Sequence, residues 1–116
     1  MRSQPARRPV DHVFHALAHP ARVRVVERLG RGPASVTELA APAQMSLPAF
    51  MQHLKVLEQA GVVRSDKAGR VRTYHLEAAP LVEASGWLAQ QRRLWERRLD
   101  QLDEYVRSMK ELEDEG

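Results

Sequence analysis

Apolar residues recur at helical spacing near the start of the chain. Four of them share the i, i+3, i+4, i+7 pattern of one helix face: Val10, Val13, Phe14 and Leu17. This pattern predicts a helix that begins at Pro9 and is interrupted by His19-Pro20, because the residue before a proline avoids helical backbone and proline suits a first turn. A second helix is expected from Pro20 to about Arg31, with three residues on its inner face: Val23, Val26 and Leu29.

Two helix-capping signals follow the segment GRGP at residues 30–33. Ser35 precedes Glu38 by three positions, a capping-box pattern that predicts a short third helix with three inward residues: Val36, Leu39 and Ala40. Ser46 is expected to cap a fourth helix, with Pro48 in its first turn and Gly61 just past its end. The buried stripe of this helix has i, i+4, i+7 spacing: Phe50, Leu54 and Leu57.

The hydrophobic period changes after Gly61. Two β-prone runs, 62–65 and 70–76, flank the segment DKAG and predict a β-hairpin with a glycine in its turn. The helical period then returns from Ala79 to about Lys110, and Gly86 marks a bend or a close packing point in this long helix. Its apolar residues follow a heptad seam: Leu88, Trp95, Leu99, Leu102, Val106 and Met109.

Composition narrows the class of protein. A chain of 116 residues is one domain by length, and the absence of cysteine excludes disulfides and thiolate metal sites. No apolar run reaches membrane-spanning length and the start does not resemble a secretory signal, so a cytoplasmic protein is expected. Residues 1–75 hold 12 Lys and Arg against 5 Asp and Glu, whereas residues 76–116 hold 6 against 10. A basic front of this kind suits a polyanionic partner.

The order of the predicted elements is that of a winged helix-turn-helix: four helices, a hairpin, and a last helix. PAQMS, at residues 42–46, is the turn, and the helix after Ser46 is the recognition helix, whose first residues would meet base edges in the major groove. We therefore expect a mainly α fold with a small β-hairpin. Its parts are a disordered arm over 1–8, a DNA-binding domain over 9–77, a dimerisation helix over 78–110, and a frayed acidic tail over 111–116.

Four segments resemble successive blocks of the ArsR-type winged helix-turn-helix repressors: FHALAHPARVRVVERL, SVTELA, MSLPAFMQHLKVLEQAGVV and GRVRTYHL. The resemblance covers roughly residues 10–77, and HLKVLEQAGVV followed by a wing with GR and Tyr74 is its most specific part. Membership of this family implies a homodimer that binds operator DNA and represses transcription until an inducer or metal releases it.

Candidate DNA contacts lie on the recognition helix and the wing. Gln52 can pair bidentately with adenine, and Leu47, Pro48 and Met51 can touch thymine methyl groups. Ser46 caps the helix and can also meet a phosphate. His53 matches a histidine of the family and either donates to a phosphate or fills the seam between the helix and the hairpin. The remaining candidates are basic residues suited to phosphates: Lys55, Arg64, Lys67, Arg70 and Arg72, with Arg22 and Arg24 as weaker ones.

Many members of this family sense metals, so we compare their metal-ligand positions with the residues of this chain. Where thiol-based sensors carry a Cys-x-Cys pair before Glu-Leu, this chain has Ser35 and Thr37, and its last helix contains no histidine. One alternative remains, a cluster of His12, His15 and His19 with i, i+3, i+7 spacing, although capping and packing explain these residues better. No cofactor is therefore expected, and the favoured prediction is a metal-independent repressor.

The last helix is expected to pair with a second copy of the chain. The predicted dimer contacts are Val13 on the first helix and five residues of the heptad seam: Leu88, Trp95, Leu99, Leu102 and Val106. A small-molecule inducer is left open, and so is a protein-interaction role in which the last helix joins a different coiled coil. The chain has no nucleophile–base set and no glycine-rich phosphate loop, so an enzyme is not expected.

Overall fold

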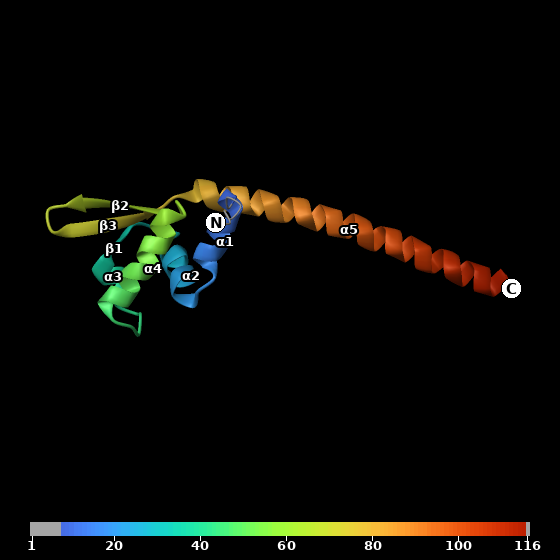
Figure 1. The fold of residues 1–116 in the computed structure, drawn as a ribbon, viewed down its shortest axis with the longest axis horizontal. Coiled ribbons are helices and arrows are strands. Elements are labelled where there is room, and N and C mark those ends of the chain that lie inside the picture. Colours follow the sequence, from blue (N-terminus) through green and yellow to red (C-terminus); the bar gives the residue numbers. More distant parts are fainter. Residues whose placement is uncertain (1–7, 116) are drawn as a thin grey trace, which may run out of the picture. The chain divides into compact units, whose positions relative to one another are not determined.

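A computed structural model describes residues 8–115 of the chain. Figure 1 shows its elements in order: α1 (Pro9–Leu17), α2 (Pro20–Leu29), β1 (Ala34–Ser35), α3 (Val36–Ala40), α4 (Leu47–Gln59), β2 (Val63–Ala68), β3 (Val71–Leu76) and α5 (Ala78–Glu115). They form two units, one ending at Ala84 and the other starting at Ser85. The predicted disordered arm falls outside the described residues, except for Arg8, the N-cap residue of α1.

The long C-terminal helix differs from its predicted limits. α5 begins in the first unit, so the division between the units lies after Ala84 rather than after residue 77. It also continues to Glu115, whereas the sequence predicted a frayed tail from residue 111. The extension follows from composition, because residues 107–113 contain only one poor helix former, Ser108, among Arg, Lys, Glu, Leu, Met and further good formers.

A three-stranded antiparallel sheet, rather than a hairpin alone, stands beside the helices, with strand order β1-β3-β2. β1 is two residues long and pairs Ala34 with Tyr74 and Ser35 with Thr73. Ser35 then caps α3, where its hydroxyl accepts the Glu38 N–H at 3.2 Å and the Glu38 carboxylate accepts the Ser35 N–H at 3.2 Å. The sheet therefore fixes the position at which α3 starts.

The hairpin of β2 and β3 is longer than predicted. Ala68 pairs with Val71, which leaves Gly69 and Arg70 as a two-residue turn. Gly69 has a φ of 62°, the positive value that such turns require at their first position, and Asp66 and Lys67 belong to the strand rather than to the turn. Figure 1 shows this hairpin projecting beyond the helices of its own unit, as a wing does.

The hydrophobic core confirms the predicted stripe of α4 and corrects that of α2. Phe50, Leu54 and Leu57 are at most 2% exposed. On α2, however, Val23 is 37% exposed, and Val25 takes its place in the core. Valines at several neighbouring positions fit either face, and packing against the other helices decides between them. The buried apolar residues that form the core are Val13, Ala16, Val25, Leu29, Ala34, Leu39, Phe50, Leu54, Leu57, Val62, Val63, Tyr74 and Ala84.

Val13, predicted at a dimer contact, is instead buried in the core of its own chain with 1% exposure. Its neighbour Phe14, predicted to point inward, is 37% exposed. The face of α1 that packs on the core is therefore rotated toward Val13 and Ala16, and Val13 has no surface left for a partner. Within residues 8–115, no helix is both long enough and apolar enough to span a membrane.

Candidate nucleic-acid interface

The start of α4 presents a polar and apolar surface without acidic residues. The Ser46 hydroxyl accepts the Ala49 N–H at 3.3 Å, which caps the helix as predicted. Leu47 is 57% exposed, and Pro48, Gln52 and Lys55 are exposed as well. Met51 is only half-buried, because part of its side chain packs against the core.

The strand register decides which basic residues of the wing share the face of α4. Side chains alternate between the two faces of a strand, so cross-strand partners lie on the same face. Lys67 is paired with Arg72 and Ser65 with Tyr74, and these four residues share one face of the hairpin. Arg70 is exposed at the hairpin tip, and no hydrogen bond or ion pair involving Lys67 or Arg70 occurs among residues 8–115.

An open groove joins this face of the wing to α4. We call it the recognition cleft, and six residues line it: Met51, Gln52, Lys55, Glu58, Arg72 and Tyr74. Its volume is about 420 Å³. Four predicted DNA contacts thus meet in one place, because Met51, Gln52 and Lys55 come from the helix and Arg72 from β3.

Glu58 and Ser65 also belong to this site, although neither was among the predicted DNA contacts. The Ser65 hydroxyl donates to the Glu58 carboxylate at 2.7 Å and accepts from Arg72 Nη1 at 2.7 Å. One hydroxyl therefore links α4 to the arginine of the wing. Burial, together with the nearby Glu58 carboxylate, raises the pKa of Tyr74, which stands beside this link. The alternation of Val63, Ser65 and Lys67 was the available signal for Ser65.

Arg64 lies on the opposite face of the wing from the recognition cleft. Its guanidinium pairs with Asp66 at 2.9 Å and with Glu77 at 2.5 Å. Hydrogen bonds that Arg64 donates to these two carboxylates, with the one to Glu77 the larger effect, raise the pKa of Arg64. Asp66 also lies 3.2 Å from His75 Nε2 on the same face. The placement of Arg64 does not support its predicted contact with DNA, because Asp66 and Glu77 already match the charge of its guanidinium.

His53 faces the corner between α1 and α2 rather than the wing. Its ring lies 4.2 Å from that of His19, centroid to centroid, and its Nδ1 lies 3.0 Å from Arg22 Nη1. Arg22 also donates to the carbonyl oxygens of Ala16 at 2.7 Å and His15 at 3.3 Å, at the end of α1. A guanidinium can only donate, so His53 Nδ1 is the acceptor and carries no proton. Arg22, a weak phosphate candidate by sequence, therefore joins three helices.

Burial, then the charges of His19 and Arg22, lowers the pKa of His53. The neutral imidazole is thus the form that fits this seam. Of the two alternatives for His53, the structure favours packing over a phosphate contact, and the seam it fills is the one with the α1–α2 corner.

The alternative histidine cluster is not assembled. α1 ends at Leu17, so His19 does not continue the helix that carries His12 and His15. Instead the His19 ring accepts the Ala21 N–H at 3.0 Å and caps α2. Across the residues that the structure describes, no three His, Cys, Asp or Glu side chains gather closely enough to hold a metal ion.

The second unit presents an apolar face that is exposed among the residues the structure describes. Trp95 is 65% exposed, Leu99 64%, Leu102 57% and Val106 43%. We call the exposed large apolar residues of the second unit the α5 stripe: Leu88, Leu94, Trp95, Leu99, Leu102, Tyr105, Val106, Met109 and Leu112. A Cβ added at Gly86 meets no atom of the described residues within 4 Å, so close packing, one of the two expectations for Gly86, is not found among residues 8–115.

Comparison with known proteins gives a consistent picture. A family model described as a helix-turn-helix domain matches residues 17–66. The HTH-type transcriptional regulator Rv2034 of Mycobacterium tuberculosis is 45% identical over 74 residues, which cover 64% of this chain and 69% of that protein. The transcriptional repressor SdpR of Bacillus subtilis is 27% identical over 79 residues, covering 68% of this chain and 88% of that protein.

Solved structures extend the similarity beyond the matched domain. The crystal structure of an ArsR family transcriptional regulator, RHA00566, superposes with a TM-score of 0.73 at 48% identity, covering 77% of this chain and 98% of that chain. An ArsR-like transcriptional regulator from Rhodococcus sp. RHA1 superposes with a TM-score of 0.69 at 32% identity, covering 81% and 89%.

Proposed function

The chain belongs to the ArsR family of winged helix-turn-helix transcriptional regulators, and from that premise we propose that it is a homodimeric repressor of an inverted-repeat operator. The observation that carries this proposal is the recognition cleft. There the exposed side chains of α4 and the basic face of the wing adjoin without an intervening element. A helix that only had to meet water would carry charge along the surface that Leu47, Met51 and Gln52 occupy.

The chemistry of each side chain in and around the recognition cleft decides whether it would contact bases or phosphates. Gln52 has both the donor and the acceptor needed for adenine, and Leu47, Pro48 and Met51 offer apolar contact to thymine methyl groups. Lys55, Lys67, Arg70 and Arg72 supply the charge that holds phosphates, which position a protein without reading sequence. Ser46 can add a phosphate contact at the start of α4, beside the free N–H groups of its first turn. Arg64 and His53 are left out of this set, because each is already engaged within the chain.

The second copy of the chain would cover the α5 stripe. Fully burying one large apolar side chain contributes roughly 1.5–3 kcal/mol, so a face of nine such residues is costly to leave in water. The spacing of Trp95, Leu99, Leu102, Val106 and Met109 alternates between four and three, which is the pattern of a two-helix seam.

Charge favours an antiparallel partner. Residues 92–98 hold four arginines against one glutamate, whereas residues 100–115 hold seven acidic residues against two basic ones. Antiparallel pairing brings the basic segment of one copy to the acidic segment of the other, while parallel pairing brings like charges together. Charged residues of α5 also pair with one another within the helix, as Arg107 does with Asp103 at 2.7 Å. The residues of the α5 stripe are all uncharged.

We propose further that repression needs no metal. This rests on the residues at the family's ligand positions, Ser35 and Thr37, and on the separation of His19 from His12 and His15. Operator affinity should then be the same with and without a chelator, and added zinc or nickel should not release DNA.

Selection of bound DNA from a random pool, followed by a salt series on the selected sequence, tests the proposal. A dimeric repressor predicts two inverted half-sites about one helical turn apart and an affinity that falls steeply with salt. A matched control is Lys110→Gln, since Lys110 is exposed on α5, lies outside the basic segment 92–98 and is not among the residues that line the recognition cleft. Failure to prefer any sequence over bulk DNA, even at low salt, would contradict the proposal.

A further inference from the structure

A cavity of about 260 Å³ lies between α2, α3 and the start of α4. Its apolar lining consists of Ala21, Val25, Leu39, Pro42, Ala43, Met45 and Phe50. Val25, Leu39 and Phe50 are core residues, so the floor of the cavity is rigid. Apart from Arg24, a weaker phosphate candidate by sequence, none of the predicted DNA contacts lines it, and it shares no lining residue with the recognition cleft.

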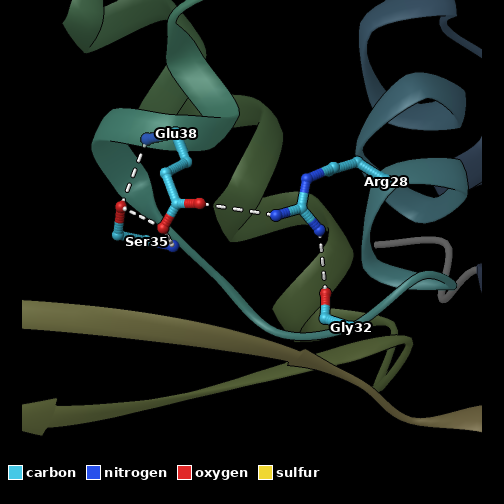
Figure 2. Close-up of polar contacts among 4 residues, drawn as sticks. All are labelled: Arg28, Gly32, Ser35 and Glu38. Atoms are coloured by element: carbon cyan, nitrogen blue, oxygen red, sulfur yellow. Dashed lines mark hydrogen bonds and ion pairs between the residues drawn. The ribbon is translucent and has the colours of Figure 1, made fainter.

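Arginines form one rim of this cavity. Arg24, Arg28 and Arg31 have i, i+4, i+7 spacing and so lie along one face of α2. Figure 2 shows Arg28 held in place, with one nitrogen on the Gly32 carbonyl at 3.0 Å and another on the Glu38 carboxylate at 3.4 Å. These bonds use two of the five N–H donors of the guanidinium, so three stay available.

The acidic residues of the rim do not cancel this charge. Glu38 is already engaged by the Ser35 N–H and by the Ser35 hydroxyl at 3.1 Å, and these hydrogen bonds, the backbone one first, lower its pKa. Among residues 8–115, Arg24 and Arg31 make no hydrogen bond or ion pair. With Glu27 as the only other carboxylate, the rim keeps one more arginine than it has acidic residues.

We propose that this cavity, the effector pocket, binds a small organic acid whose apolar body fills the floor and whose carboxylate meets the arginine rim. The apolar floor distinguishes this ligand from a DNA phosphate, which has no apolar body to bury. The volume lies just below the roughly 300–1,000 Å³ of drug-sized ligand sites, which favours a bicyclic aromatic or medium-chain acid. Planar guanidinium groups suit a carboxylate because they can donate to both of its oxygens.

The position of the pocket connects it to DNA binding, so its regulatory role rests on the proposed repressor function. Phe50 lines the pocket from α4, and Met45 lines it from the turn that leads into α4. Leu39 and Pro42 line it from α3 and the residues after it, which are the first half of the helix-turn-helix. A ligand wedged against α2 would therefore shift α3 and α4 relative to α2 and weaken operator binding.

Two matched probes test the pocket: indole-3-acetate, and its neutral counterpart indole-3-acetamide. Binding to the full chain would be followed by calorimetry and by amide shifts of the lining residues. We expect saturable binding of the acid at one site per chain, with the amide at least about tenfold weaker, since charge-assisted hydrogen bonds are the stronger class. We also expect the acid to lower affinity for the selected operator.

Two variants and a control locate the site. Arg31→Gln removes a free charge from the rim and should weaken the acid severalfold without changing the affinity of ligand-free protein for operator. Ala43→Phe fills the cavity and should abolish binding of both probes. The control, Lys110→Gln, removes the same charge from an exposed position on α5 outside the basic segment 92–98 and should change neither measurement.

Several outcomes would overturn the proposal. These are the absence of saturable binding, equal affinity for acid and amide, or amide shifts confined to α5. A loss of operator affinity in the ligand-free Arg31→Gln protein would instead identify the rim as a phosphate contact and also overturn it. Failure of the repressor function is distinguishable, because ligand-free protein would then bind no operator while the acid still bound its site.

Discussion

Ser65→Ala is the sharpest test of how the recognition cleft is built, because one hydroxyl joins Glu58 of α4 to Arg72 of the wing. The change deletes two hydrogen bonds of 2.7 Å to charged groups. Such bonds contribute roughly 1.5–3 kcal/mol each when well shielded. Glu58 and Arg72 are exposed, so solvent screening reduces the expected loss of folding stability to about 1 kcal/mol in total.

The larger consequence concerns DNA. Once released, Arg72 must be ordered at the moment of binding, which costs roughly 0.5–1.5 kcal/mol for a long side chain. The dissociation constant for operator should rise about 2- to 12-fold in each subunit's half-site. The number of phosphate contacts does not change, so the slope of log affinity against log salt should stay the same, whereas Arg72→Gln should reduce that slope by about 0.9 for each subunit, or about 1.8 for the dimer.

Fluorescence anisotropy of labelled operator over a salt series measures both quantities. Ser108→Ala is the matched control, since Ser108 is exposed on α5 and has no hydrogen bond among the residues described. If Ser65→Ala changed the salt slope as much as Arg72→Gln does, or left affinity at the native level, the hydroxyl would not be positioning Arg72.

Three further predictions concern base reading, assembly and pH. Gln52→Ala should reduce discrimination between operator and altered sites by about 1–3 kcal/mol in competition assays; equal losses for operator and bulk DNA would argue against base reading. Trp95→Glu puts a charge into the α5 stripe and should yield monomers in sedimentation, and a dimer that persists would place the seam elsewhere. The pKa of His53 is lowered, so the folded state binds a proton at this side chain less readily than the unfolded state does. The contribution of neutral His53 to the free energy of unfolding is therefore complete above about pH 6.5 and is lost as pH falls through the lowered pKa. The melting temperature should therefore fall more steeply with acid in native protein than in His53→Gln, with His12→Gln as the control; parallel profiles would contradict this reasoning.

The sequence predicted α4 well because its signals are local and mutually consistent. Ser46 caps it, Phe50 and Leu54 share its buried face, and Gly61 ends it with a φ of 74°. That angle lies in the left-handed region that other residues avoid, so a glycine there is a strong stop signal. The position and length of α4 therefore follow from these residues alone.

Features set by contacts between distant segments could not be predicted in the same way. β1 has only two residues, too few to show a strand period, and it exists because β3 offers it a partner. On α2, the sequence allows either Val23 or Val25 to face inward, and packing selects Val25. Likewise, nothing local indicates that Arg64 is matched by Glu77, because that ion pair needs the register of the finished hairpin.

α4 is held from three sides by different kinds of contact, and this limits how a signal can reach DNA. His53 meets Arg22 at 3.0 Å, and Glu58 meets Ser65 at 2.7 Å, so both of these attachments are already closed. On the third side Phe50 borders a cavity of about 260 Å³. A ligand can add contacts only where space remains, and it can move a helix only where that helix forms part of the wall. Apart from the recognition cleft, which DNA itself would occupy, the wall at Phe50 is the place beside α4 that satisfies both conditions.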